Sequence, residues 1–418
     1  MEISSNPDFS GLERVVIEQE RLSLLNPGSI YRGFMRQITY WPALGIGAAL
    51  LPIRPKYCEN VHLTGIKEHI YKEGKPVRGP FLWALKHESW FDALDLIPEI
   101  HNVPETIRMK VIVRDNYFKN RLYNSLMNFA AKPYGIVVKR TGQDGQYLSD
   151  EERERLTRHN IRSIGTVLYR LMKGDNIFFL PEGTTRNNGT FIPLKSGLWR
   201  ASHHVFDGKL YVANCVPVGN TYDFMAGVGD KHQVFINIGE IFHYEPVEFE
   251  GESSEAYRKK DKLYFAERLR EKLVELHTFT TSQLGGLYIR ALIEKGKDKF
   301  SKEELYQAMV KMTEELQGRE HGYKLFFDPD LLNSEKRFYR FERLFSRMIE
   351  TGYVSMDGFE CVINKDRMQY VPPDDIYKAE NPWRYMTNRP LSGAKMKKSL
   401  KNAFERSLEI DLDRIEAA

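Results

Sequence analysis

His87 and Asp92 are the residues whose types and spacing could do acid–base chemistry. An imidazole titrates near neutral pH, and a carboxylate beside it can fix its tautomer. A separation of five residues places the two about 140° apart on a helix, so they cannot share one helical face. They can meet only if His87 lies in the turn before a helix and Asp92 in its first turn. One ring nitrogen would then bond to the carboxylate, and the other would be free to act as a general base.

A second interpretation of the same residues is purely structural. Ser89 is a suitable N-cap for a helix over residues 89–97, and Asp92 stands three positions later, where a capping box has its acid. In that case His87 is an ordinary loop residue. The spacing alone leaves both interpretations open.

The residues before His87 predict how it is positioned. Residues 81–85 form an unbroken apolar run, typical of a strand buried on both faces of a parallel sheet. The other strand candidates are residues 61–63, 110–113, 136–138, 177–180, 211–218 and 234–238. Apolar positions at helical spacing over residues 161–172, closed by Gly174, and the charged stretch 253–276 predict helices between and after them. This alternation predicts an α/β domain with a largely parallel central sheet flanked by helices.

Cations and turn residues follow several of these strands. Lys139 and Arg140 come directly after residues 136–138, and residues 181–186 (PEGTTR) come after residues 177–180. Arg114 follows residues 110–113. Because the carboxyl ends of parallel strands form the ligand-binding edge of such a sheet, these groups are candidates to bind phosphate. Taken one at a time, each is equally compatible with a solvated charge in a loop.

Four segments resemble the motifs of the glycerolipid acyltransferase family, in that family's order. Residues 87–92 resemble its His-x4-Asp motif, residues 135–140 its second motif, and residues 179–186 its Glu-Gly-Thr-Arg block. Residues 216–218 resemble its fourth motif, a short apolar segment with proline. The resemblance covers about residues 63–242.

The resemblance implies particular roles. His87 would be the base and Asp92 would orient it, and the substrate-binding residues would be Arg114, Lys139, Arg140, Glu182, Gly183, Thr184 and Arg186. Glu182 would orient either a glycerol hydroxyl or its own loop. Two departures are visible: Lys86 stands where the family usually has Asn, and an extra Thr precedes Arg186. Both bear on the fine details of acceptor contact.

The implied activity is transfer of a fatty acyl group from acyl-CoA or acyl carrier protein to a glycerol-phosphate hydroxyl in phospholipid synthesis. Pro181 is typical of enzymes that use 1-acylglycerol-3-phosphate, whereas Tyr222 and Asp223 look more like those that use glycerol-3-phosphate. We expect the first acceptor; the second, or a non-catalytic membrane-associated binding protein on this scaffold, is the alternative. No Gly-x-Ser-x-Gly elbow and no metal-ligand spacing is present, so we expect direct transfer without a metal or cofactor.

A membrane surface is expected at the amino-terminal side. Residues 38–53 carry no charge and are flanked by Arg36 and Arg54, but they fall short of the roughly 20 apolar residues that span a bilayer. Tyr40 and Trp41 suit a headgroup boundary. We therefore expect a peripheral or monotopic contact at the cytoplasmic face of a membrane; a buried helix explains the segment equally well. The three separated cysteines are typical of a reducing compartment.

The carboxyl-terminal part has a different character. Residues 301–304 form a capping box, residues 334–351 predict a second helix, and a hairpin follows around Asp357 and Gly358. Helices followed by a hairpin suggest a smaller, winged-helix-like α+β domain. Because its first helix is acidic and the net charge is only +4, we expect no nucleic-acid partner.

The Lys- and Arg-rich residues 390–406 could meet anionic lipids or form a solvated, mobile end. The predicted domains are residues 1–60, 61–280 and 281–418.

Overall fold

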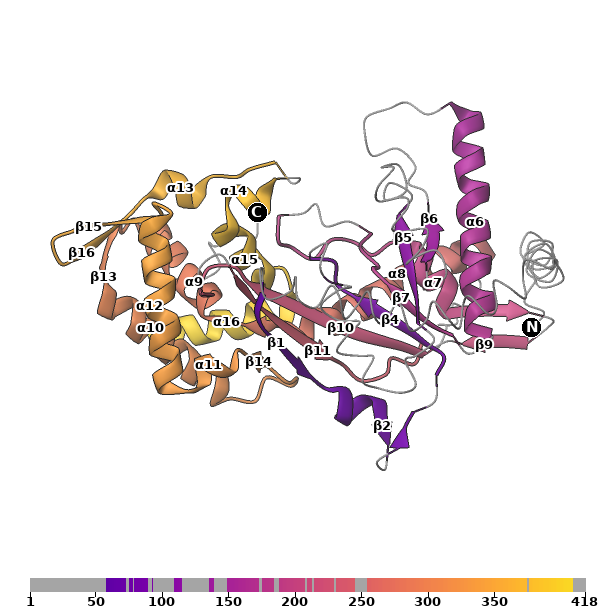
Figure 1. Cartoon of the computed structure of the whole chain (residues 1–418), viewed down its shortest axis with the longest axis horizontal. Coiled ribbons are helices and arrows are strands. Elements are labelled where there is room, and N and C mark those ends of the chain that lie inside the picture. The colour runs from indigo at the N-terminus through magenta and orange to yellow at the C-terminus, as the bar shows by residue number, and fades with distance from the viewer. Residues whose placement is uncertain are drawn as a thin grey trace.

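The structure is a computed structural model of the chain (Figure 1). It describes residues 58–72, 75–77, 79–88, 92, 109–114, 135–138, 149–172, 175–183, 188–206, 209–212, 214–228, 231–244, 254–373 and 376–408. Residues 1–57 lie outside this set, and with them the predicted membrane-contacting segment 38–53. Within the described ranges, no helix combines the length and the apolar character needed to cross a membrane.

A seven-stranded sheet organises the first two thirds of the described chain. Its strand order is β1-β11-β10-β4-β7-β5-β6, and all neighbouring pairs are parallel except β10 and β11. The strands are β1 (Cys58–Thr64), β4 (Phe81–Leu85), β5 (Met109–Arg114), β6 (Gly135–Val138), β7 (Asn176–Phe179), β10 (Asn214–Asp223) and β11 (His232–Ile238). The predicted largely parallel sheet is therefore confirmed.

One predicted strand is wrong. The apolar run 211–218 is not one strand: β9 (Lys209–Val212) pairs with β8 (His203–Phe206), and β10 begins at Asn214. β10 then continues past the predicted end at Val218 to Asp223, because it pairs with β11 along its second half. That extension carries Asn220 and Tyr222 beyond the end of β4, where Val218 pairs with Leu85.

Both faces of the sheet are buried, as the apolar run 81–85 predicts. Leu82 and Ala84 belong to one apolar core, and Phe81, Trp83 and Leu85 to a second core on the opposite face. Alternate residues of a strand point to opposite faces, which is why the one run serves both. The helices beside the sheet are α6 (Asp150–Met172), α7 (Ser196–Ser202) and α8 (Ser254–Glu275). Smaller elements are η1 (Ile66–Ile70), β2 (Tyr71–Lys72), β3 (Lys75–Pro76), β12 (Thr278–Phe279) and β14 (Phe326–Phe327).

The carboxyl-terminal module, residues 281–408, is helical with one small sheet. It contains α9 (Thr281–Glu294), β13 (Lys299–Ser301), α10 (Lys302–Gln317), α11 (Pro329–Leu332), α12 (Ser334–Glu350), β15 (Val354–Asp357) and β16 (Glu360–Ile363). The capping box at Ser301 and Glu304 is formed as predicted. The hairpin also forms, but its loop is Gly358 and Phe359, since Asp357 pairs with Glu360. β13 completes an antiparallel sheet of three strands.

Four helices close the described chain: α13 (Lys365–Gln369), α14 (Tyr377–Glu380), α15 (Pro382–Leu391) and α16 (Ala394–Leu408). The expectation of a mobile, solvated end over residues 390–406 is wrong. Met396, Leu400 and Phe404 recur at four-residue spacing, and all three are buried in the core. The segment is an amphipathic helix, which its basic residues by themselves did not indicate.

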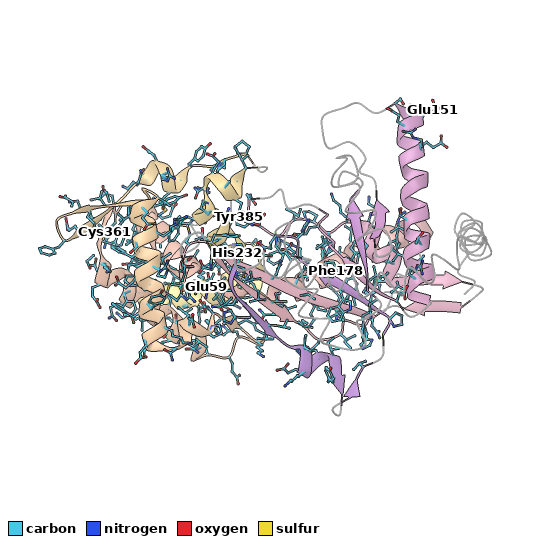
Figure 2. All side chains as sticks on the ribbon, viewed as in Figure 1. Glu59, Glu151, Phe178, His232, Cys361 and Tyr385 are labelled. Carbon is cyan, nitrogen blue, oxygen red and sulfur yellow. The ribbon has the colours of Figure 1, made fainter. Side chains whose placement is uncertain are left out.

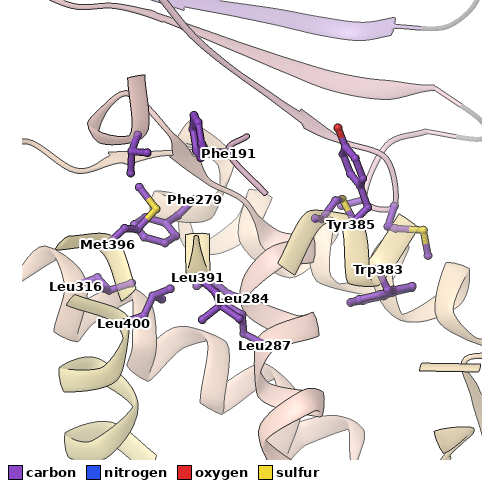
Figure 3. Packing of buried hydrophobic residues seen from close by; sticks show 14 of the residues in the cluster. Phe191, Phe279, Leu284, Leu287, Leu316, Trp383, Tyr385, Leu391, Met396 and Leu400 are labelled. Atoms are coloured by element: carbon purple, nitrogen blue, oxygen red, sulfur yellow. The ribbon is translucent and has the colours of Figure 1, made fainter. Parts of the chain in front are cut away.

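The module is joined to the sheet by a continuous apolar core. The cluster that contains Leu82 and Ala84 of β4 also contains Leu284 of α9 and Leu391 of α15 (Figure 3). In Figure 1 the orange and yellow module lies against one end of the sheet. α15 also packs onto the loop that follows β7: at Gly189, which has φ +93°, an added Cβ would overlap the carbonyl oxygen of Tyr385.

This close approach yields a stability prediction. Gly189→Ala is expected to destabilise the fold by about 1–2 kcal/mol for the left-handed backbone and by a further ~1–3 kcal/mol for the overlap with α15. Gly296→Ala is the matched control, since Gly296 has φ +74° and open space at its Cβ. Denaturant unfolding of both variants measures the difference. Equal losses at the two positions would show that α15 does not press against Gly189.

Candidate active site

His87 and Asp92 meet at the carboxyl end of β4. The Nδ1 atom of His87 lies 2.9 Å from Oδ2 of Asp92. Asp92 is buried, whereas the His87 side chain keeps 15% of its surface exposed. His87 lies in the turn after β4 and Asp92 is helical, as the spacing required. With Nδ1 turned to the carboxylate, Nε2 is the ring nitrogen left to contact a substrate.

Three further donors hold the Asp92 carboxylate. The backbone N–H of Glu88 donates to Oδ2 at 2.7 Å. On the other oxygen, Asn220 Nδ2 donates to Oδ1 at 2.8 Å and the Tyr222 hydroxyl at 2.7 Å. Asn220 and Tyr222 are two residues apart on β10, so their side chains share one face of the strand. A buried carboxylate bonded in this way is fixed in position and presents one oxygen to His87.

Glu88, the residue after His87, is held by the carboxyl-terminal module. Its carboxylate is ion-paired with Arg389 of α15, and its Oε2 accepts a hydrogen bond from the Tyr385 hydroxyl at 3.1 Å. Its carbonyl oxygen accepts from Lys378 Nζ of α14 at 3.3 Å. Glu88 and Arg389 are each only 2% exposed. Figure 2 places Tyr385 at the boundary between the module and the strands of the sheet.

Lys86, on the other side of His87, is buried in a second ion pair. Its Nζ lies 3.1 Å from Oε1 of Glu182 and donates to the carbonyl oxygen of Thr190 at 3.2 Å. The ammonium also lies 4.3 Å from the centre of the Phe191 ring. Burial, aided by the guanidinium of Arg389, lowers the pKa of Lys86, and the Glu182 carboxylate opposes that shift.

Glu182 itself faces inward. It is completely buried and accepts a further hydrogen bond from the Ile192 N–H at 3.2 Å. Of the two roles left open by the sequence, orienting an acceptor hydroxyl or holding its own loop, these contacts match the second. Gly183 follows with φ +67°, a backbone conformation that favours glycine and turns the chain sharply after Glu182.

The predicted phosphate-binding residues are placed only in part. Arg114 is the last residue of β5, and β4, β5, β6 and β7 run parallel, so their carboxyl ends share the edge that carries His87. The described side chains do not include that of Arg114. Lys139, Arg140, Thr184 and Arg186 lie outside the described residues. Among the residues that are described, no group of three or more His, Cys, Asp or Glu side chains is arranged to hold a metal ion.

Several residues at the site were not predicted. Asn220 was missed, and Tyr222 was noted only as an indicator of the acceptor and not as a partner of Asp92. Both contacts could have been found from the two-residue alternation of a longer β10. Lys378, Tyr385 and Arg389 carry no local signal, because they lie nearly 300 residues from Glu88 in sequence.

Comparison with protein families matches residues 65–218 to the family described as Acyltransferase. Those residues are an acyltransferase-family domain. The family recognised from the motifs at residues 87–92 and 179–186 is thereby confirmed, and the matched segment contains both ends of the His87–Asp92 and Lys86–Glu182 contacts.

Among solved structures, the chain is similar to the 1-acyl-sn-glycerophosphate (LPA) acyltransferase PlsC from Thermotoga maritima. The sequence identity is 17% and the TM-score 0.33, over 63% of this chain and 94% of that one. Comparison with curated proteins finds no match.

The buried Lys86–Glu182 pair yields a prediction. Lys86→Met leaves the Glu182 carboxylate buried without its cation and is expected to cost about 3–5 kcal/mol of unfolding free energy. Adding Glu182→Gln removes the charge yet keeps an acceptor for the Ile192 N–H, so the double variant should recover more than half of that loss. Denaturant unfolding of the single and double variants forms the cycle. A double variant no more stable than Lys86→Met would show that the two charges are not coupled.

Proposed function

We propose that this protein is an O-acyltransferase that moves a fatty acyl group from an acyl thioester to the hydroxyl of 1-acylglycerol-3-phosphate in phospholipid synthesis. The observation that carries the proposal is the hydrogen bond from His87 to the buried Asp92 carboxylate within an acyltransferase-family domain.

In the proposed reaction, Nε2 of His87 removes the proton of the acceptor hydroxyl while that oxygen attacks the thioester carbonyl carbon. The negative charge of Asp92, already bonded to the other ring nitrogen, stabilises the imidazolium. As the tetrahedral species collapses, the carbon–sulfur bond breaks and the thiolate takes the proton from His87. The products are an ester and a free thiol, with no acyl-enzyme, metal or cofactor. The donor is acyl-CoA or acyl carrier protein.

The acceptor's phosphate would be bound by cations at the same edge of the sheet. We assign this role to Arg186, Lys139 and Arg140, with Arg114 at the end of β5, on the resemblance of their motifs and the parallel register of β5, β6 and β7. Gly183 and Thr184 would shape the loop that carries Arg186. An arginine can bind a phosphate with two parallel hydrogen bonds, which suits a group that must be held in one orientation.

Glycerol-3-phosphate is the alternative acceptor, and its support in the sequence was Tyr222 and Asp223. The Tyr222 hydroxyl is bonded to Asp92, and Asp223 accepts hydrogen bonds from the N–H groups of Met225, Ala226 and Ser282. Both side chains are therefore engaged inside the protein. This favours the acylated acceptor indicated by Pro181.

The module would serve this domain by packing. Its order of elements, α9, β13, α10, α12, β15 and β16, is consistent with the proposed winged-helix-like fold. Glu303, Glu304, Glu314 and Glu315 give α10 an acidic character, unsuited to nucleic acid. A non-catalytic binding protein is a weaker proposal, because the His87–Asp92 pair is formed and held by buried donors.

Catalysis gives the first test of the proposal. Purified protein is offered labelled acyl-CoA with either 1-acylglycerol-3-phosphate or glycerol-3-phosphate, and product ester is measured. His87→Ala should abolish transfer, and Asp92→Asn should lower kcat by about a hundredfold to ten-thousandfold, the range expected for a disturbed general base. Near-normal turnover by a folded His87→Ala variant rules out the proposed base. A preference for glycerol-3-phosphate would show that the proposed acceptor is wrong and leave the proposed reaction intact.

We also propose that residues 38–53 hold the protein at the cytoplasmic face of a membrane, where an acylated acceptor resides. Deletion of residues 1–53 should release the folded protein from phosphatidylcholine–phosphatidylglycerol vesicles in a sedimentation assay. High salt should not release the full chain, because apolar insertion is not screened. Full sedimentation of the truncated protein, abolished by salt, would place the contact on a basic surface instead.

A further inference from the structure

We propose that Arg389 of α15, with Tyr385 and Lys378, is a positioning residue for the His87–Asp92 pair, so that the carboxyl-terminal module completes the active site. The inference rests on the proposed acyl transfer and extends it to a part of the chain outside the matched family segment, residues 65–218.

Arg389 contacts two of the residues that donate hydrogen bonds to the Asp92 carboxylate. It is ion-paired with Glu88, whose N–H donates to Oδ2 of Asp92. It also donates through Nη1 to the carbonyl oxygen of Asn220 at 3.4 Å, and the Asn220 side chain donates to Oδ1. One guanidinium therefore fixes two of the residues that hold the carboxylate, one from β4's turn and one from β10. Its rigid, planar donors suit such bridging.

Arg389 reaches the loop after β7 as well. Its Nε donates to the carbonyl oxygen of Gly189 at 3.3 Å, and the guanidinium lies 5.6 Å from the centre of the Phe191 ring. The same loop contributes the Thr190 carbonyl that binds Lys86. The turn after β4, the loop after β7 and strand β10 thus meet at one side chain from the module.

Tyr385 and Lys378 hold the remaining atoms of Glu88. The Tyr385 hydroxyl donates to Oε2 of the carboxylate and Lys378 donates to the carbonyl oxygen, so the module holds both the side chain and the backbone of Glu88. Figure 3 shows the Tyr385 hydroxyl directed away from Trp383 and toward the strands. Since Glu88 directly follows His87, fixing its backbone restricts where the imidazole can lie. Displacements of about 1 Å at such a site can cost on the order of a hundredfold in rate.

The first test compares two buried arginines that both join the module to the sheet. Arg389→Lys keeps the charge but loses the fork, and Arg389→Met with Glu88→Gln removes both charges. Arg340 is the matched control: it is buried and pairs with Glu59 and Asp330, at a contact that involves no residue of the His87 turn. Its variants are Arg340→Lys and Arg340→Met with Glu59→Gln and Asp330→Asn, which removes all three charges of that contact.

The Arg389 variants are expected to lower kcat by about tenfold or more, with the KM of each substrate changed by less than about threefold. The Arg340 variants should lose comparable thermal stability with kcat within about twofold. A folded Arg389 variant with wild-type kcat overturns the inference, as does an equal loss of kcat in both series.

A smaller change keeps the test decisive if the Arg389 variants do not fold. Tyr385→Phe removes one hydroxyl and its hydrogen bond to Glu88, and should lower kcat several-fold by the same reasoning. Tyr353→Phe removes a buried hydroxyl that bonds to Asn381, inside the module, and should leave kcat unchanged. Equal kcat in the two tyrosine variants overturns the inference.

A spectroscopic measurement separates this inference from the proposed function. The proton between His87 Nδ1 and Asp92 should give a downfield resonance in histidine-labelled protein, assigned by its loss in His87→Ala. The resonance should broaden or vanish in the Arg389 and Tyr385 variants and persist in the Arg340 and Tyr353 variants. Its persistence in all of them overturns the positioning role, whatever the substrate. Failure of the wild-type protein to transfer an acyl group overturns the proposed function alone.

Discussion

Buried charge next to His87 is the constraint on which the rest of the structure depends. Taking a carboxylate out of water costs several kcal/mol unless an opposite charge and hydrogen bonds replace the water. The turn after β4 contains or contacts three such carboxylates. The described partners that face them come from two distant parts of the chain: Lys86 and His87, at the turn itself, face Glu182 and Asp92, and Arg389 of α15 faces Glu88. The fold must bring these parts together or leave charge uncompensated.

This requirement explains why the module is not a separate appendage. Its apolar core is continuous with that beneath the sheet, and the polar contacts of α15 lie where that core ends. Apolar burial supplies the driving force for docking, at about 25 cal/mol per Å². The Glu88–Arg389 pair then specifies the orientation, because an unpaired charge penalises every other arrangement. If Arg389 has the proposed positioning role, stability and alignment of the active site are coupled through this one pair.

Local patterns in the sequence were enough to predict the elements and the central pair. Residues 81–85 form a strand because their side chains are apolar on both faces, and the five-residue spacing of His87 and Asp92 required the turn that is present. Ser301 and Glu304 cap α10 for equally local reasons. Contacts such as Glu88 with Arg389 could not be predicted, because a pairing across 300 residues depends on how whole elements pack. The prediction for residues 390–406 failed for a different reason. It considered the basic residues of the segment and overlooked the apolar positions at helical spacing, which are buried.

Lys86 departs from the family pattern, and its contacts show that it is a buried partner of Glu182. In the sequence it stood beside His87 in place of the family's usual asparagine, which suggested an effect on acceptor contact. Its ammonium instead contacts Glu182, the carbonyl oxygen of Thr190 and the ring of Phe191. A cation there compensates Glu182 and ties the loop after β7 to the end of β4. The same loop meets Arg389 through Gly189. Both neighbours of His87 are thus held in buried ion pairs, Lys86 with Glu182 and Glu88 with Arg389, while the imidazole between them keeps part of its surface exposed.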